Sequence, residues 1–125
     1  MNKLIDGIDA YQQGDYDRAM QILLPLAEEG NAKAQCHVAS MYQAGLGVTV
    51  DGHAAVKWYR RAAEQEDRSE NISGVAYHNL AMIFTTGLPG VSPDPRFAKE
   101  YLRRASDLGV ELVPRDWWQR GKAHS

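Results

Sequence analysis

The chain has 125 residues, of which 44% are hydrophobic and 24% charged, a composition typical of one globular domain rather than of a disordered segment. Fourteen basic and sixteen acidic side chains leave a net charge of −2, so no overall field draws the protein to nucleic acid, and no apolar run approaches the roughly 20 residues of a membrane span. A single cysteine, Cys36, excludes an internal disulfide, and the first residues lack a signal-peptide pattern, so we expect a cytoplasmic protein that acts away from membranes.

Residues 39–63 and 81–106 are near copies of each other. They align at an offset of 42 residues as far as Leu46 and Leu88, and at 43 residues beyond, so that Pro89 alone accounts for the change. A repeat of this length predicts stacked supersecondary units, and such units usually form a binding surface rather than a reaction centre.

In chain order, we predict three pairs of antiparallel helices, in units 1–30, 31–66 and 72–109, followed by a short capping segment, 110–125. The fold class is therefore all-α, an α–α superhelix. The first helix of each unit carries one packing face at helical spacing, namely Leu4, Gly7, Ile8 and Tyr11, then Gln35, Val38, Ala39 and Tyr42, then Tyr77, Leu80, Ala81 and Phe84. The second helices align in the same way at Ala19, Leu23 and Leu26, at Ala55, Tyr59 and Ala62, and at Ala98, Leu102 and Ala105.

Residues that start or stop helices mark the boundaries. Side-chain acceptors that can cap a helix precede four of the predicted helices, at Asp15, Asn31, Asp51 and Asp94, and glycines end the first helices at Gly14, Gly45 and Gly87. Pro25 lies inside the second helix of the first unit, where we expect a bend or the start of a new turn. Residues 67–72 are an insertion between units and are expected to form an exposed loop or an extra helical turn.

Residues 34–65 resemble the Sel-one-like repeat, a longer-looped branch of the tetratricopeptide superfamily. The resemblance is carried by Ala39, Met41, Tyr42, Gly45, Gly47, Val48, Asp51, Ala55, Trp58, Tyr59, Arg60, Arg61, Ala62, Ala63, Glu64 and Gln65. Residues 72–109 match the same pattern more loosely, and residues 4–30 resemble the shorter tetratricopeptide form. The resemblance implies a right-handed superhelix whose first helices line a concave groove. It also implies a non-enzymatic adaptor that holds a protein or peptide partner.

Counting along the first helices predicts which residues point into that groove. This predicted strip consists of Ile5, Asp9 and Gln12 in the first unit, Lys33, Cys36, Ser40 and Gln43 in the second, and His78, Met82 and Thr85 in the third. We expect Lys33 and Gln43 to donate hydrogen bonds to a peptide and Met82 to make an adaptable apolar contact. The alternative is a solvated helix face without a partner.

Other patterns suggest further roles. Cys36 and His78 occupy equivalent repeat positions, so a thiolate–imidazole pair is conceivable, and it keeps open the alternative of a small-ligand or hydrolase-like protein. The histidines show no metal-ligand spacing, and we expect neither a metal nor a cofactor. Arginine pairs recur one repeat apart, at 60–61 and 103–104. These arginines could contact phosphate. Alternatively, they lie on an outer helix face, where the aliphatic parts of their side chains cover apolar surface.

Two adjacent tryptophans, Trp117 and Trp118, fall in the last segment. With Arg120 and Lys122 they resemble a small patch for stacking bases, but a cap on the open end of the solenoid is favoured. The outward-facing indole could then contact a partner or a second copy of the chain. Self-association through this tail is therefore a third alternative.

Overall fold

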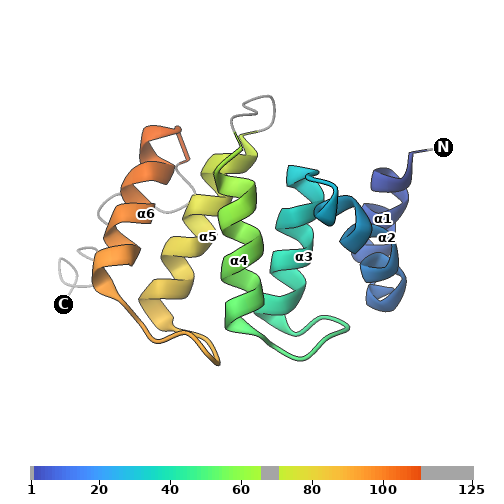
Figure 1. The fold of residues 1–125 in the computed structure, drawn as a ribbon, viewed down its shortest axis with the longest axis horizontal. Helices are drawn as coiled ribbons and strands as arrows, with labels where there is room; N and C mark the ends of the chain where they lie inside the picture. Colours follow the sequence, from blue (N-terminus) through green and yellow to red (C-terminus); the bar gives the residue numbers. More distant parts are fainter. Residues whose placement is uncertain (1, 66–70, 111–125) are drawn as a thin grey trace, which may run out of the picture.

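A computed structural model describes residues 2–65 and 71–110, and the structural statements that follow concern these residues. They form six α-helices that pair in sequence order (Figure 1). The helices are α1 (Lys3–Gln12), α2 (Tyr16–Glu28), α3 (Ala32–Ala44), α4 (Gly52–Ala63), α5 (Ile72–Thr86) and α6 (Pro95–Asp107). The described residues contain no strand, only an isolated bridge between Leu88 and Val91. The predicted all-α solenoid of three helix pairs is confirmed.

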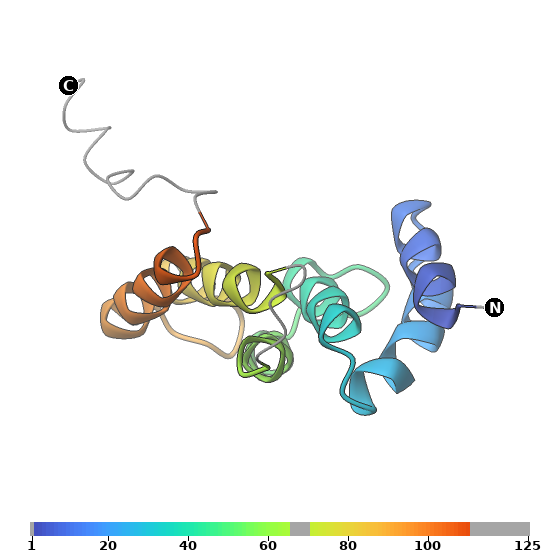
Figure 2. The same ribbon diagram turned by 90° about the horizontal axis from the view of Figure 1, so that it is seen from above.

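Each helix packs mainly on its neighbours in the chain, the arrangement expected of a repeat protein. α4 lies on the opposite side of the layer from α3 and α5, and the α1–α2 pair is turned relative to the helices that follow (Figure 2). α3 and α5 therefore belong to one side of the layer and α4 to the other.

Short polar side chains set the helix starts. The side chains of Asn2, Asp15, Asn31, Asp51 and Asp94 each accept a hydrogen bond from a backbone N–H of the following helix, so all four predicted caps are confirmed. α5 differs. Asn71 adopts a left-handed conformation with φ of 51°, and its Nδ2 donates to the carbonyl of Leu108 at 3.0 Å. This contact ties the start of α5 to the end of α6.

The core runs through all three pairs, along the predicted packing faces and also through Met41 and Ile83, which lie outside the predicted faces. Its largest fully buried side chains are Leu23, Val38, Met41, Leu80 and Ile83. Alanines with no exposed surface, such as those at 19, 55 and 62, let neighbouring helices approach closely.

The extra residue of the third unit, Pro89, lies in a tight turn. Leu88 and Val91 exchange backbone hydrogen bonds across Pro89 and Gly90, and Gly90 has φ of 87°, as the third position of a type II turn requires. The carbonyl of Pro89 accepts the N–H of Gly52 at 2.9 Å. The turn at Pro89 therefore joins the third unit to the first turn of α4.

α2 is continuous through Pro25 as far as Glu28, so the proline does not end the helix. The ring removes the N–H that would otherwise bond to the carbonyl of residue 21, four positions earlier. Pro25 itself is exposed.

Candidate functional site

The predicted strip lies on α1, α3 and α5, with none of its ten residues fully buried. Ile5 is one of two large hydrophobic side chains that are exposed in the described chain, at 54%. Asp9 and Gln12 are also exposed, whereas Lys33, Cys36, Ser40 and Gln43 are half-buried. The structure therefore brings a largely uncharged strip to the surface of three consecutive first helices.

One end of this strip opens into a hollow of about 570 Å³. Its walls come from the amino-terminal ends of α1, α3 and α5 and from the residues that follow α2 and α4. The lining residues are Asn2, Leu4, Ile5, Gly30, Asn31, Ala32, Lys33, Gln65 and Ile72. Ile5 and Lys33 belong to both the strip and the hollow. A partner that follows the strip would thus find an apolar and a cationic contact at the same end.

Hydrogen bonds with tyrosines hold two strip residues in place. The hydroxyl of Tyr59, on α4, donates to Oε1 of Gln43 at 2.8 Å. Among the described residues, Nε2 of Gln43 has no hydrogen-bond partner, and donation by this amide nitrogen to a peptide stays a prediction. The hydroxyl of Tyr11, on α1, lies 3.0 Å from Oγ of Ser40, and its ring makes an edge contact with His37. Ser40 is therefore already engaged within the fold.

The pKa values of Cys36 and His78 do not indicate a reactive pair. Burial raises the pKa of the Cys36 thiol to about 12, and burial lowers the pKa of His78. Each shift follows from desolvation of a charged form. A thiolate–imidazolium pair would lower the thiol pKa instead, because the positive ring stabilises the thiolate.

The third unit contributes a more apolar section of the strip. Met82 is half-buried on α5, and Thr85 uses its hydroxyl to donate to the carbonyl of Ala81 at 2.7 Å. Val75 and Asn79, which the sequence analysis missed, are half-buried and share this side of α5 with Met82, since spacings of three, four and seven residues fall on one helix face. Applying the same spacing back from Met82 could have found them.

The second and third helix pairs match a known family of repeats. Residues 32–67 and 74–110 match the model of the Sel1 repeat. These two matches span α3–α4 and α5–α6 and cover more than half of the chain. The chain belongs to the Sel1 repeat family. Membership indicates a helical repeat of the kind that mediates protein interactions.

A curated relative of this Sel1 repeat protein is an exopolysaccharide production negative regulator of Rhizobium leguminosarum bv. viciae. The two are 33% identical over 111 residues, which cover 83% of the present chain. The chain spans 42% of the length of that relative.

Several other predictions concern features outside the strip. In residues 2–65 and 71–110, no three His, Cys, Asp or Glu side chains are grouped so that they could hold a metal ion, and no helix is long and apolar enough to cross a bilayer. Trp117 and Trp118 lie outside the described residues, as does most of the predicted insertion. The cap and the tail interface therefore remain predictions.

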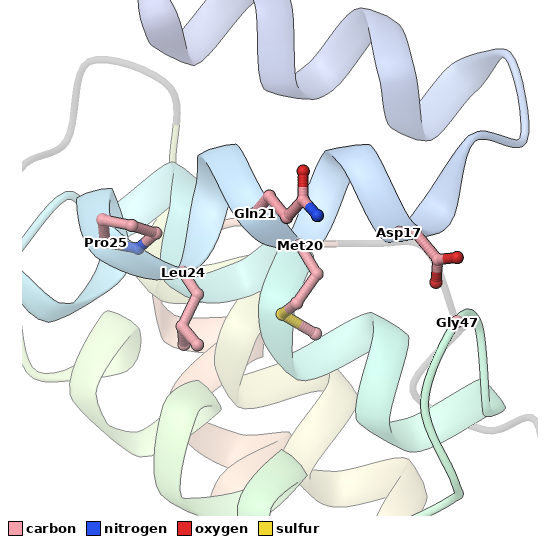
Figure 3. A pocket seen from close by; sticks show the side chains of 6 residues that line it. All are labelled: Asp17, Met20, Gln21, Leu24, Pro25 and Gly47. Atoms are coloured by element: carbon pink, nitrogen blue, oxygen red, sulfur yellow. The ribbon is translucent and has the colours of Figure 1, made fainter.

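This Sel1 repeat protein has a second hollow, of about 430 Å³, beside α2 (Figure 3). It is lined by Asp17, Met20, Gln21, Leu24, Pro25 and, from the loop after α3, Gly47. Met20 and Leu24 point to one side of α2 and Gln21 to the other. Sequence reasoning did not identify this hollow, because an outer helix face with scattered apolar residues is normal in soluble proteins.

Proposed function

We propose that this protein is a non-enzymatic adaptor that holds a peptide or protein element along the strip on α1, α3 and α5. The observation that carries the proposal is the hydrogen bond from Tyr59 to Gln43, because it fixes the side chain of this expected donor before a partner binds. A donor that is held in place before binding loses little freedom when a partner arrives. The proposed setting is the cytoplasm.

The strip also suggests the chemistry of the partner. Its charged members are Asp9 and Lys33, while the remainder are amide, hydroxyl, thiol, imidazole and apolar side chains. We therefore expect an extended or helical segment of low charge, with an apolar side chain that enters the hollow beside Ile5.

The test is affinity capture from the native host, followed by measurement of the purified partner against variants by calorimetry. Lys33→Ala, Gln43→Ala and Met82→Ala combined should weaken binding at least tenfold. The matched control changes three exposed residues of α2 and α4, as Arg18→Ala, Gln21→Ala and His53→Ala, and should bind as the wild type does. Equal affinity of the strip variant and the wild type would exclude this surface as the binding site.

The named relative supports a second, biological part of the proposal. We propose that the adaptor restrains the production of an extracellular polysaccharide, as the name of the Rhizobium relative says of that protein. Deleting the gene should increase exopolysaccharide in the host, and the strip variant should fail to reverse the increase. Unchanged exopolysaccharide after deletion would refute this role and leave the proposed peptide binding to be judged separately.

A further inference from the structure

The second helices of the last two units carry a strong positive charge that the net charge of the chain conceals. α4 contains three cations, Lys57, Arg60 and Arg61, and no carboxylate. α6 contains four cations and two carboxylates, so the two helices together have a net charge of +5, against −2 for the whole chain. By contrast, residues 1–31 contain six carboxylates and two cations.

The cations of α4 are not neutralised by ion pairs with the carboxylates of the described residues. In the described part of the chain, the ion pairs join Arg96 to Asp94, Arg103 to Glu100 and Asp107, and Arg104 to Glu100. None of the three α4 cations has a carboxylate partner among these residues. Lys57 and Arg61 instead lie over the ring of Trp58, at 4.8 and 5.0 Å from its centroid. Both Lys57 and Arg61 are exposed, so their charge is accessible to the solvent.

An exposed aromatic residue stands beside these cations. Phe97, on α6, is 43% exposed and rests on Phe84 and Tyr101, with ring centroids 5.2 and 6.1 Å away. The guanidinium of Arg60 crosses from α4, donates from Nε to the hydroxyl of Tyr101 at 2.9 Å, and lies 5.8 Å from the ring of Phe97. A stacked arginine and a supported phenylalanine are side chains that commonly anchor protein interfaces.

Repeat alignment shows that this arrangement is particular to the junction between α4 and α6. When Ala55 is aligned with Ala98, Phe97 corresponds to Ala54 of α4. The preceding junction, between α2 and α4, thus has a methyl group where the next has an aromatic ring. The exposed ring is therefore not required by the repeat itself.

We propose that the surface formed by Lys57, Arg60, Arg61, Arg96 and Phe97, here called the basic wall, docks a short acidic segment of a partner protein. Carboxylates would approach the cations, and an apolar side chain of the segment would cover Phe97. A protein segment is favoured over nucleic acid because a long polyanion would also pass the acidic first unit. A short segment feels mainly the local field, which is screened within about 8 Å at physiological salt. The basic wall is separate from the strip, so the two proposals stand or fall independently.

The test uses a fluorescent twelve-residue peptide in which glutamates flank a central Leu-Phe pair, and a matched peptide with glutamine in place of glutamate. Fluorescence polarisation is measured at 50 and 300 mM salt. The glutamate peptide should bind at least tenfold more tightly than the glutamine peptide, and more weakly at the higher salt. Equal binding of the two peptides, or no binding of the glutamate peptide, would overturn the proposal.

Variants locate the site. Lys57→Glu with Arg96→Glu changes two exposed residues and should reduce affinity for the glutamate peptide at least tenfold, and Phe97→Ser should reduce it severalfold. Arg18→Glu on α2 changes charge in the same direction away from the wall and should have little effect. If Arg18→Glu weakens binding as much as a wall substitution does, only overall charge matters and the proposal fails.

Two further arms separate other occupants from the proposed one. Lys33→Ala with Gln43→Ala should leave binding of the glutamate peptide unchanged, because these residues belong to the strip. A single-stranded DNA oligonucleotide of equal charge should bind more weakly than the peptide. Tighter DNA binding that the wall variants abolish would show a nucleic-acid surface and refute docking of an acidic protein segment.

Discussion

Gln35, near the start of α3, and Gln65, just after α4, form a side-chain hydrogen bond, and each also bonds to the backbone of the first unit. Nε2 of Gln65 donates to Oε1 of Gln35 at 2.9 Å and to the carbonyl of Gly30 at 2.8 Å. Nε2 of Gln35, in turn, donates to the carbonyl of Ala27 at 3.0 Å. Gln35 is only 3% exposed, so these bonds satisfy polar groups that water does not readily reach. Two amides thus fix the junction of the first two units.

Replacing Gln35 by leucine, a side chain of similar size that cannot form hydrogen bonds, should therefore reduce stability. Gln35→Leu removes one of two donors to the carbonyl of Ala27, the other being the N–H of Gly30, and removes one acceptor of Gln65. The loss of these two hydrogen bonds should lower the free energy of unfolding by about 1–3 kcal/mol. Urea denaturation followed by circular dichroism measures the change. The control, Gln12→Leu, alters an exposed glutamine on α1 and should shift stability by less than about 0.5 kcal/mol. Equal stability of the two variants would contradict the structural role of the buried amide.

Gly52 should tolerate no side chain despite its helical position. A Cβ at this residue would lie 2.6 Å from the carbonyl oxygen of Pro89 and 2.8 Å from Cγ2 of Val91. Helix propensity favours alanine over glycine by up to about 1 kcal/mol. The clash involves backbone, however, and overpacking typically costs about 1–3 kcal/mol. We predict that Gly52→Ala is net destabilising in thermal melts, whereas the neighbouring exposed His53→Ala is nearly neutral. A higher melting temperature for Gly52→Ala would show that propensity outweighs the contact between units.

The lone thiol should be unreactive in the native protein. Because burial raises the pKa of Cys36 to about 12, the thiolate fraction at pH 8 is roughly a thousandfold below that of an ordinary cysteine. Alkylation by iodoacetamide should be correspondingly slow in buffer and fast in urea, and Cys36→Ser provides the blank. Rapid alkylation of the native protein would instead revive the reactive pair with His78.

The same pKa shift makes stability depend on pH. Below the ordinary thiol pKa, near 8.5, Cys36 is protonated whether the chain is folded or unfolded, and its contribution to stability is complete. Between that value and about 12, the thiol ionises in the unfolded chain first, so stability falls as pH rises. The free energy of unfolding of the wild type should therefore fall more steeply between pH 8.5 and 11 than that of Cys36→Ala. Parallel pH profiles would show that the thiol is not desolvated.

The fold could be read from the sequence because its signals are local and repeated. Asp51 and Asp94 precede corresponding helices, and Ala55 and Ala98 mark corresponding close approaches, so each unit supports the assignment of the other. The strip on α1, α3 and α5 could be located for the same reason, since helix periodicity decides which side chains share a face. Whether that strip binds a partner stays a prediction.

Features that depend on contacts between units could not be predicted in this way. The extra residue Pro89 was recognised as a change of register, but its hydrogen bond with Gly52 requires the loop after α5 to meet the start of α4. Arg60 was expected either to contact phosphate or to cover apolar surface with its stem, and its position over Phe97 depends on the approach of α4 to α6. Overall charge hid the basic wall, because the acidic first unit offsets it in the total.

Pro25 offers a last test, since the same substitution at two prolines should have opposite effects. Within a helix, proline is about 3 kcal/mol less favourable than alanine, although alanine also frees the unfolded chain by about 0.4–1 kcal/mol. Pro25 is exposed in the last turn of α2, so Pro25→Ala should raise the free energy of unfolding by about 2–2.5 kcal/mol. Pro95 stands at the first position of α6, where its missing N–H costs nothing, so Pro95→Ala should be neutral or slightly destabilising. Urea denaturation of both variants compares them directly. A loss of stability in Pro25→Ala would mean that the ring's contacts beside α2 outweigh the missing backbone hydrogen bond.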